Sequence, residues 1–318
     1  MRDHGGNLDT AMARWGGGPE EWIDLSTGIN SSPYPLPEFD DRAWTDLPMR
    51  SDLELLRETA RMAYGCVTGV LPVAGAQAAI QMIPVSCKHG LVRVLGPTYN
   101  EHAASFARSG WTVETVERPT ALAGADAAVV VNPNNPDGRI LAPEQLRAIS
   151  TRVGLLVVDE SFVDPRPNIS LAREIPDNTL VLRSFGKFYG LAGLRLGFVL
   201  GGEARLAALA ELAGPWPVSG VAIRVGQAAL ADAAWRKAAA ARLARDAARL
   251  DDLARTGGWE LVGGSELFRL YRVPDAVDAQ VHLAMERIWS RTFPYSTDWL
   301  RLGIPGPDHW TRVEAALL

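Results

Sequence analysis

The chain has 318 residues, of which 47% are hydrophobic and 22% are charged, which is enough for one large core and a smaller one. Its formal net charge is −5 without long basic runs, so we expect no binding to nucleic acid. No stretch approaches the roughly 20 apolar residues that span a bilayer, and no apolar signal segment follows Met1, so we expect no membrane attachment. The two cysteines, Cys66 and Cys87, fit a reducing compartment, and we expect a cytoplasmic protein.

The first two thirds of the chain predict an α/β domain. An amphipathic pattern from about residue 51 predicts a helix that ends at Gly65. Short apolar runs then alternate with helical patterns: strands are expected at 71–73, 91–95, 112–116, 127–131, 155–158, 180–183 and 196–200, and helices at 76–83, 100–109 and 143–150. Strands that are apolar on both faces and separated by helices predict a mostly parallel seven-stranded sheet between two helical layers.

The pattern changes near residue 203 and predicts a second, smaller α+β domain. Helices are expected at 203–213, 221–231 and 234–256, followed by a strand at 267–273, a helix at 279–288 and a strand near 299–302. Residues 1–45 are rich in Gly, Pro and Trp and show little periodicity. We therefore predict an N-terminal arm at 1–45 that packs with the small domain, a large domain at 46–205 and a small domain at 206–318.

The strongest chemical pattern is SFGK at 184–187, followed by GLRLG at 193–197. A single lysine in a loop is usually a solvated surface residue. Here Ser184 and Arg195 flank Lys187 at spacings that would place a hydroxyl and a guanidinium beside one anion, such as a phosphate. A lysine that forms Schiff bases with carbonyl compounds is a known covalent catalyst.

Three motifs upstream complete the pattern. The run VVDESF at 157–162 places Asp159 at the end of an apolar strand, where a carboxylate can cap a helix or pair with a protonated pyridine nitrogen. The turn NPNNPDG at 132–138 is either a simple loop or a way to present the Asn135 amide to a ring oxygen. The run GAQ at 75–77 opens a helix whose free amides can hold a phosphate.

Together and in this order, these motifs resemble the fold-type-I pyridoxal-phosphate enzymes of the class I/II aminotransferase branch, over residues 70–200. The resemblance implies pyridoxal 5'-phosphate as cofactor, with Lys187 as the Schiff-base lysine, Asp159 as the partner of the pyridine nitrogen and Asn135 as a donor to the ring oxygen. It also implies a phosphate cup and a stacked aromatic ring, made by Ser184, Arg195, Gly75, Ala76, Gln77 and Tyr99. No metal is expected.

Two positions depart from this family. Many members place a tyrosine three residues after the aspartate, where this chain has Phe162, so one donor to the ring oxygen is missing. The resemblance also implies a homodimer in which each subunit lends a tyrosine to the phosphate of the other. That tyrosine would fall near Leu47 and Pro48, where the chain has none, so the sequence leaves the cross-subunit contact open.

The N-terminal arm narrows the resemblance to one branch. The runs HGGN at 4–7, DLSTGIN at 24–30 and WLRLGIP at 299–305 resemble the threonine-phosphate decarboxylases of cobalamin biosynthesis, which are relatives of the histidinol-phosphate aminotransferases. The implied reaction is decarboxylation of O-phospho-L-threonine to (R)-1-amino-2-propanol O-2-phosphate. An aminotransferase acting on a phosphorylated substrate such as histidinol phosphate is the alternative, because it would use the same residues. A pyridoxal-binding regulator is a further alternative, which the retained Lys187 argues against.

The same resemblance implies a small phosphorylated amino acid as substrate, and it assigns residues to bind it. Arg301 would hold the α-carboxylate, and Asn135 would lie beside the bound substrate. Arg291, His4, the Gly5 amide and Asn30 would recognise the phosphate on the substrate side chain.

Overall fold

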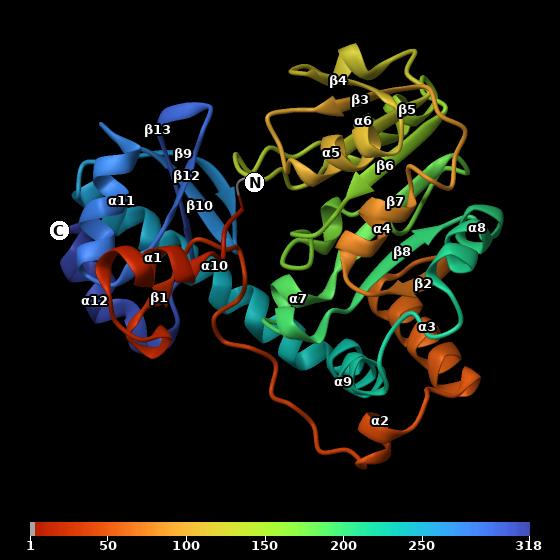
Figure 1. The fold of residues 1–318 in the computed structure, drawn as a ribbon, viewed down its shortest axis with the longest axis horizontal. Coiled ribbons are helices and arrows are strands. Elements are labelled where there is room, and N and C mark those ends of the chain that lie inside the picture. Colours follow the sequence, from red (N-terminus) through yellow and green to blue (C-terminus); the bar gives the residue numbers. More distant parts are fainter. Residues whose placement is uncertain (1–3) are drawn as a thin grey trace.

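The computed structural model describes residues 4–318, in which a large sheet and a smaller sheet are joined by one long helix (Figure 1). The large sheet has seven strands in the order β2-β8-β7-β6-β5-β3-β4, and β8 alone runs against its neighbours. The strands are β2 (Gly69–Val73), β3 (Leu91–Leu95), β4 (Thr112–Val116), β5 (Ala127–Val131), β6 (Leu155–Asp159), β7 (Thr179–Ser184) and β8 (Gly197–Gly201). The predicted α/β fold with a mostly parallel seven-stranded sheet is confirmed.

Alternating apolar residues hold helices on both faces of this sheet. Val129 and Val157 enter a cluster with α4, α5 and α8, whereas Val130 and Val158 enter a second cluster with α3, α6 and α9. The helices are α3 (Arg50–Tyr64), α4 (Ala76–Met82), α5 (Glu101–Arg108), α6 (Pro143–Ser150), α7 (Phe185–Phe188), α8 (Glu203–Ala213) and α9 (Gly220–Ala231). The parallel strands β5, β6 and β7 therefore end at one edge of the sheet, where ligands of α/β proteins bind.

The smaller sheet is antiparallel, in the order β12-β13-β10-β9. The strands of this sheet and the helices beside it are α10 (Ala233–Thr256), β9 (Glu260–Ser265), β10 (Phe268–Arg272), α11 (Ala276–Met285), β12 (Arg291–Phe293), β13 (Ser296–Gly303) and α12 (Trp310–Leu317). The helix predicted at 279–288 begins earlier, because the Asp275 side chain accepts the backbone N–H groups of Val277 and Asp278 and caps it there.

The N-terminal arm is more regular than its composition suggested. It contains the helix α1 (Leu8–Trp15), the strand β1 (Ile23–Asp24) and the short helix α2 (Arg42–Thr45). The strand β1 pairs in parallel with β11 (Ile288–Trp289), so the start of the arm lies against the smaller sheet (Figure 1). No helix or strand was predicted in residues 1–45, so these three elements are known only from the structure.

The packing favours a domain boundary later than residue 205. The helix α8 packs against β2, β8 and α4, and α9 packs against α3, so both belong with the large sheet. The helix α10 then crosses from the large sheet to the smaller one (Figure 1). Its N-cap residue, Asp232, separates it from α9 and accepts the N–H of Trp235 at 2.8 Å. Among residues 4–318, no helix is long and apolar enough to cross a membrane.

A backbone contact fixes the large domain against the smaller sheet at Gly138. This residue has a φ of +70°, and a Cβ placed there would lie 2.1 Å from the carbonyl oxygen of Gly264 in β9. The turn that carries Asn135 is therefore pressed against the smaller sheet, which requires glycine at its end.

We expect Gly138→Ala to lower the free energy of unfolding by about 1–3 kcal/mol, because the added methyl group meets backbone and the φ is unfavourable. Denaturant unfolding of the purified protein measures this change. Gly193→Ala is the control, since a Cβ there meets nothing within 4 Å. Equal stability of the two variants would show that the contact at Gly138 is not tight.

Candidate active site

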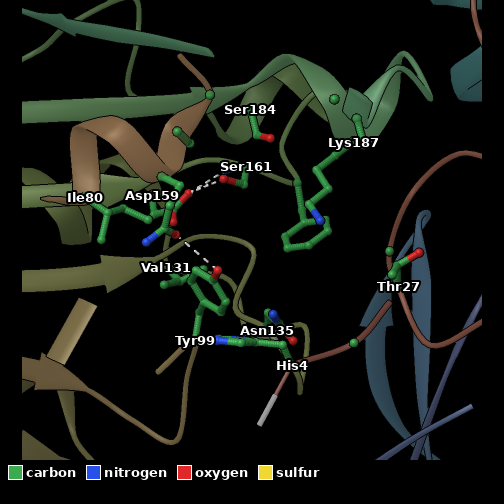
Figure 2. A pocket seen from close by; sticks show the side chains of 18 of the residues that line it. His4, Thr27, Ile80, Tyr99, Val131, Asn135, Asp159, Ser161, Ser184 and Lys187 are labelled. Carbon is green, nitrogen blue, oxygen red and sulfur yellow. Dashed lines mark hydrogen bonds between the residues drawn. The ribbon is translucent and has the colours of Figure 1, made fainter. Parts of the chain in front are cut away.

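A cleft that is open to solvent lies at the edge where β5, β6 and β7 end. Residues from the large sheet, the smaller sheet and the arm line it together. Of the predicted site residues, the lining includes His4, Gly5, Gly75, Ala76, Gln77, Tyr99, Asn135, Asp159, Ser184, Lys187, Arg195, Arg291 and Arg301. Figure 2 shows Lys187, Asp159 and Tyr99 pointing into this space.

Lys187 lies on α7, directly after β7, and its amine reaches the cleft (Figure 2). Desolvation of the amine, and after it the nearby positive charge of Arg301, lower the pKa of Lys187 from 10.5 to about 8. A substantial fraction of the amine is therefore neutral near physiological pH, which is the form that attacks a carbonyl carbon.

Asp159 is held as a buried carboxylate at the end of β6. Burial by itself would raise its pKa, but hydrogen bonds and the charge of the adjacent imidazole outweigh burial, and the pKa lies below its ordinary value. His102 Nε2 lies 2.8 Å from Oδ2, and Ser161 donates to Oδ1 from its hydroxyl at 2.5 Å and from its N–H at 3.0 Å. The anion lines the cleft and can accept a hydrogen bond from a cationic ring nitrogen.

Sequence reasoning missed His102 and Ser161 as partners of Asp159. Ser161 stands inside the VVDESF motif, two residues after Asp159, and His102 follows Tyr99 by three residues. The position of His102 could have identified it as a site residue. It lies in the first turn of α5, three residues after Tyr99, which was predicted to stack on the cofactor ring.

Two glycines make room for an anion cradle at the start of α4. A Cβ on Gly75, whose φ is +74°, would lie 2.8 Å from Nη2 of Arg195, and a Cβ on Gly197 would lie 2.5 Å from the N of Ala76. Arg195 itself has a φ of 54°, which is uncommon for a residue with a side chain. Its guanidinium, the Ser184 hydroxyl and the first amides of α4 therefore converge on the cleft, as phosphate binding requires.

Two aromatic rings border the cleft. Tyr99 donates its hydroxyl to Gln77 Oε1 at 3.2 Å, and burial raises its pKa to about 12, so the hydroxyl stays protonated. Phe162 packs edge-on against Phe268, with ring centroids 4.9 Å apart, and lies 5.7 Å from the Nζ of Lys187. An apolar ring therefore stands beside Lys187, and Phe162 offers no hydroxyl there.

Arg291 and Arg301 come from the smaller sheet and lie side by side. They are register partners on β12 and β13, and both line the cleft. Arg301 is buried and donates to Asn135 Oδ1 and, at 2.6 Å, to the carbonyl oxygen of Ser26. It therefore joins the turn after β5 to the arm. Two adjacent guanidinium groups suit a substrate with two anionic groups.

The structure corrects the prediction for Asn30, which does not line the cleft. Its buried amide donates to the carbonyl oxygen of Phe188 at 2.8 Å and accepts from Arg242 at 2.6 Å. Its own N–H donates to the carbonyl oxygen of Lys187 at 2.9 Å. Because these contacts use the side chain, Asn30 supports α7 and is not free to meet a substrate phosphate.

His4 and Gly5 line the cleft. His4 Nε2 lies 3.0 Å from Glu101 Oε1, and its ring centroid lies 6.0 Å from that of Tyr99. Together with Arg291, His4 and Gly5 also line a second, adjoining pocket beneath the arm. The arm therefore closes one side of the site.

The chain belongs to the aminotransferase class I and II family, whose model matches residues 47–316. Two curated relatives are named threonine-phosphate decarboxylase. The chain is 44% identical to the one from Sinorhizobium sp over 96% of this chain and 93% of that protein, and 42% identical to the one from Pseudomonas aeruginosa over 100% and 98%. The solved structure of histidinol-phosphate aminotransferase from Sinorhizobium meliloti in complex with pyridoxal-5'-phosphate shares the fold, with a TM-score of 0.85 at 19% identity over 97% of this chain and 93% of that one.

The lowered pKa of Lys187 predicts how the apoprotein reacts with an aldehyde. We expect the rate of covalent capture of pyridoxal phosphate, trapped with borohydride, to rise with pH and to level off above about 8, because only the neutral amine attacks. Arg301→Ala should move the midpoint upward, since removing a positive charge stabilises the protonated amine. A wild-type midpoint near 10.5, the ordinary value of a lysine, would show that the cleft does not perturb this amine.

Proposed function

We propose that this protein is a pyridoxal-phosphate-dependent decarboxylase that converts O-phospho-L-threonine to (R)-1-amino-2-propanol O-2-phosphate and CO₂, a step of cobalamin biosynthesis. One observation carries the proposal: two proteins named threonine-phosphate decarboxylase match the chain at 44% and 42% identity along nearly its whole length, including the arm. The cleft supports it, because the guanidinium groups of Arg291 and Arg301 from the smaller sheet face the end of the large sheet where Lys187 lies.

The lining of the cleft fits pyridoxal phosphate. The cradle formed by Arg195, Ser184 and the first amides of α4 would hold its phosphate, and Asp159 would pair with its ring nitrogen. Tyr99 would lie against the ring, and Asn135 would donate to the ring oxygen. When bound, the cofactor supplies an electron sink for the bond that breaks at the substrate Cα.

The substrate would be held at both ends. Arg301 is the proposed partner of the α-carboxylate, and Arg291 with His4 and the Gly5 amide would bind the phosphate on the side chain, while Asn135 lies beside Arg301. Binding at the remote phosphate can hold the Cα–carboxylate bond in the orientation in which it breaks. Lys187 is the candidate to return a proton to Cα after CO₂ has left.

The alternative is transamination of a phosphorylated amine such as histidinol phosphate. A protein named histidinol-phosphate aminotransferase from Mycobacterium tuberculosis is 30% identical over 85% of this chain and 75% of its own length, so this reaction belongs to the same family. Product analysis with the purified holoenzyme and phosphothreonine distinguishes the two. We expect CO₂ and the phosphorylated amino alcohol without an added amino-group acceptor. Formation of a keto product that depends on such an acceptor would favour the aminotransferase.

The proposed roles of Arg291 and Arg301 predict that their alanine variants lose activity differently on substrates with and without a phosphate group. We expect Arg291→Ala to lower kcat/KM for phosphothreonine about ten- to a hundredfold, because a charge-assisted hydrogen bond contributes about 1.5–3 kcal/mol. The same change should leave the small residual rate on unphosphorylated threonine nearly unaltered. Arg301→Ala should reduce both rates, because both substrates carry the α-carboxylate.

Steady-state kinetics of the two variants on the two substrates test this assignment. Equal losses on both substrates for Arg291→Ala would mean that this residue is structural and that the phosphate is bound elsewhere. An Arg301→Ala enzyme that loses activity only on phosphothreonine would mean that the two roles are exchanged.

We also propose that the protein is a homodimer. Large apolar side chains remain exposed along the segment from residue 36 to 62, namely Leu36, Trp44, Leu47, Met49, Leu55 and Met62, and soluble monomers rarely leave so many together. Light scattering at micromolar concentration should give the mass of two chains, and Trp44→Glu should shift the equilibrium toward monomer. Val277→Glu is the control, because Val277 is also an exposed apolar residue but lies on α11, in the smaller domain. A fully active wild-type monomer would contradict the proposal.

A further inference from the structure

A buried carboxylate of the large domain meets the N-terminal arm at the edge of the cleft. Glu101 lies in the first turn of α5 and is 5% exposed. It does not line the cleft itself, but its side chain contacts two residues that do, His4 and Gln77. A carboxylate is rarely buried without polar partners, because its removal from water costs free energy. The position of these partners therefore indicates what the side chain of Glu101 does.

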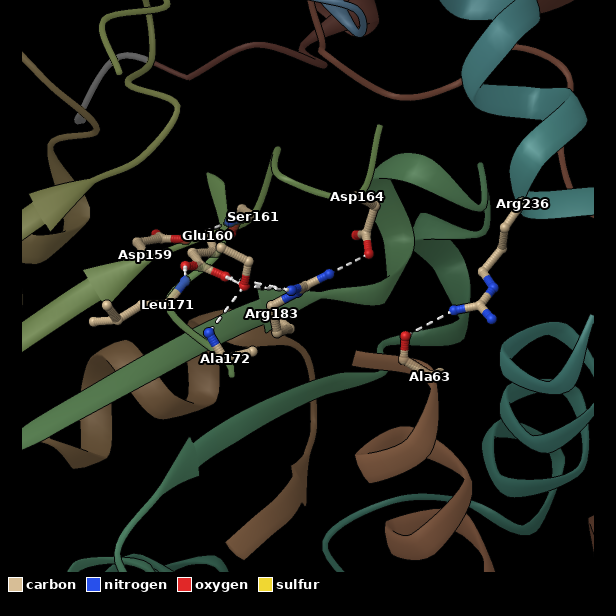
Figure 3. A network of polar contacts seen from close by, with 10 residues as sticks. Ala63, Asp159, Glu160, Ser161, Asp164, Leu171, Ala172, Arg183 and Arg236 are labelled. Carbon is tan, nitrogen blue, oxygen red and sulfur yellow. Dashed lines mark hydrogen bonds and ion pairs between the residues drawn. The ribbon is translucent and has the colours of Figure 1, made fainter. Parts of the chain in front are cut away.

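Glu160, another buried glutamate, shows the contrasting case. Its carboxylate pairs with Arg183 of β7 at 3.3 Å, and Figure 3 shows Arg183 between Glu160 and Asp164. These charges compensate one another within the large domain. Glu101 differs, because one of its partners lies on the arm.

The large domain holds one oxygen of Glu101. Oε2 accepts from Nε2 of Gln77 in α4 at 3.1 Å, and Gln77 Oε1 accepts from the Tyr99 hydroxyl at 3.2 Å. An ionised carboxylate only accepts hydrogen bonds, so the Gln77 amide must turn its nitrogen toward Glu101 and its oxygen toward Tyr99. The carboxylate is thus bonded to the helix whose first amides form the anion cradle.

The other oxygen of Glu101 meets the arm. His4 Nε2 lies 3.0 Å from Oε1, and this nitrogen can donate to the carboxylate whether the imidazole is neutral or protonated. Gly6 donates its N–H to Ser26 Oγ at 2.7 Å, which joins this segment to the rest of the arm. The arm in turn pairs with the smaller domain through β1 and β11. The contact between His4 and Glu101 therefore connects the two domains across the cleft.

We infer that Glu101 is a positioning residue, which holds the arm across the cleft and places His4 beside a bound substrate. The ring centroids of His4 and Tyr99 lie 6.0 Å apart, and both residues line the cleft (Figure 2). Because Glu101 holds Nε2, the ring of His4 turns away from the cleft only when this contact breaks. The inference rests on the proposed function for the identity of the substrate: Glu101 keeps His4 and the Gly5 amide where the substrate phosphate is proposed to bind.

Hydrogen exchange of the holoenzyme without substrate tests the contact. We expect the backbone amides of residues 5–7 to exchange about three- to tenfold faster in both Glu101→Gln and His4→Ala, because each variant weakens one charge-assisted hydrogen bond that opposes local opening. Glu144→Gln is the matched control, since Glu144 lies in the first turn of α6 and pairs with Arg147. The inference is overturned if either variant exchanges like this control. If Glu101→Gln does not fold, His4→Ala alone decides, because His4 is exposed on the arm.

A double-mutant cycle tests whether Glu101 acts through His4. We expect Glu101→Gln and His4→Ala each to lower kcat/KM for phosphothreonine about three- to tenfold and to leave the rate on unphosphorylated threonine nearly unaltered. The double variant should lose no more than the more damaging single variant. Losses that multiply in the double variant, or equal losses on both substrates, would overturn the inference.

The two experiments separate this inference from the proposed function. A wild-type holoenzyme that releases no CO₂ from phosphothreonine would refute the proposed function. The exchange of residues 5–7 would then still decide whether Glu101 holds the arm, because that measurement needs no substrate.

Discussion

A carboxylate kept ionised inside the protein is the constraint on which the site depends. Asp159 ends a strand whose residues are all buried, and burial opposes its charge. The imidazole of His102 and both donors of Ser161 reverse that preference, so the anion persists where an apolar core would neutralise it. The same cleft lowers the pKa of Lys187, so that one environment keeps an acid charged and makes a base partly neutral. Perturbed pKa values of an acid and a base in one cleft are typical of catalytic sites.

The period of two along a β-strand places different chemistry on the two faces of the sheet. On β6 and β7 the residues that face the cleft are Asp159 and Ser184, and their neighbours Glu160 and Arg183 form an ion pair on the other face. Burial of the Glu160 carboxyl raises its pKa, whereas Arg183 and the Ser170 hydroxyl act in the opposite direction. The two neighbouring strand ends are thus joined on one face by a pair of charges while the other face stays free for a ligand.

Much of this arrangement was predictable from local sequence. The seven strands were found because each is a short apolar run bounded by turns, and their order along the chain brought the loops with Asp159, Asn135 and Lys187 to one edge of the sheet. The contact of Arg301 with Asn135 was beyond local reasoning, because it depends on how the smaller sheet packs against the large one. The DLSTGIN motif identified Asn30 as a candidate but could not show where its side chain points. Hydrogen bonds with Phe188 and Arg242 determine that direction. The helix α1 was missed because the glycines and tryptophans around it masked its short apolar period.

The decisive feature of the site is the proton that Asp159 is proposed to hold on the ring nitrogen of pyridoxal phosphate. It can be measured without reference to turnover, by ¹⁵N NMR of the enzyme loaded with cofactor that is labelled at the pyridine nitrogen. We expect a protonated ring nitrogen in the wild-type enzyme at neutral pH and an unprotonated one in Asp159→Asn, with cofactor bound in both. An unprotonated nitrogen in the wild-type enzyme, or a protonated one in Asp159→Asn, would contradict it.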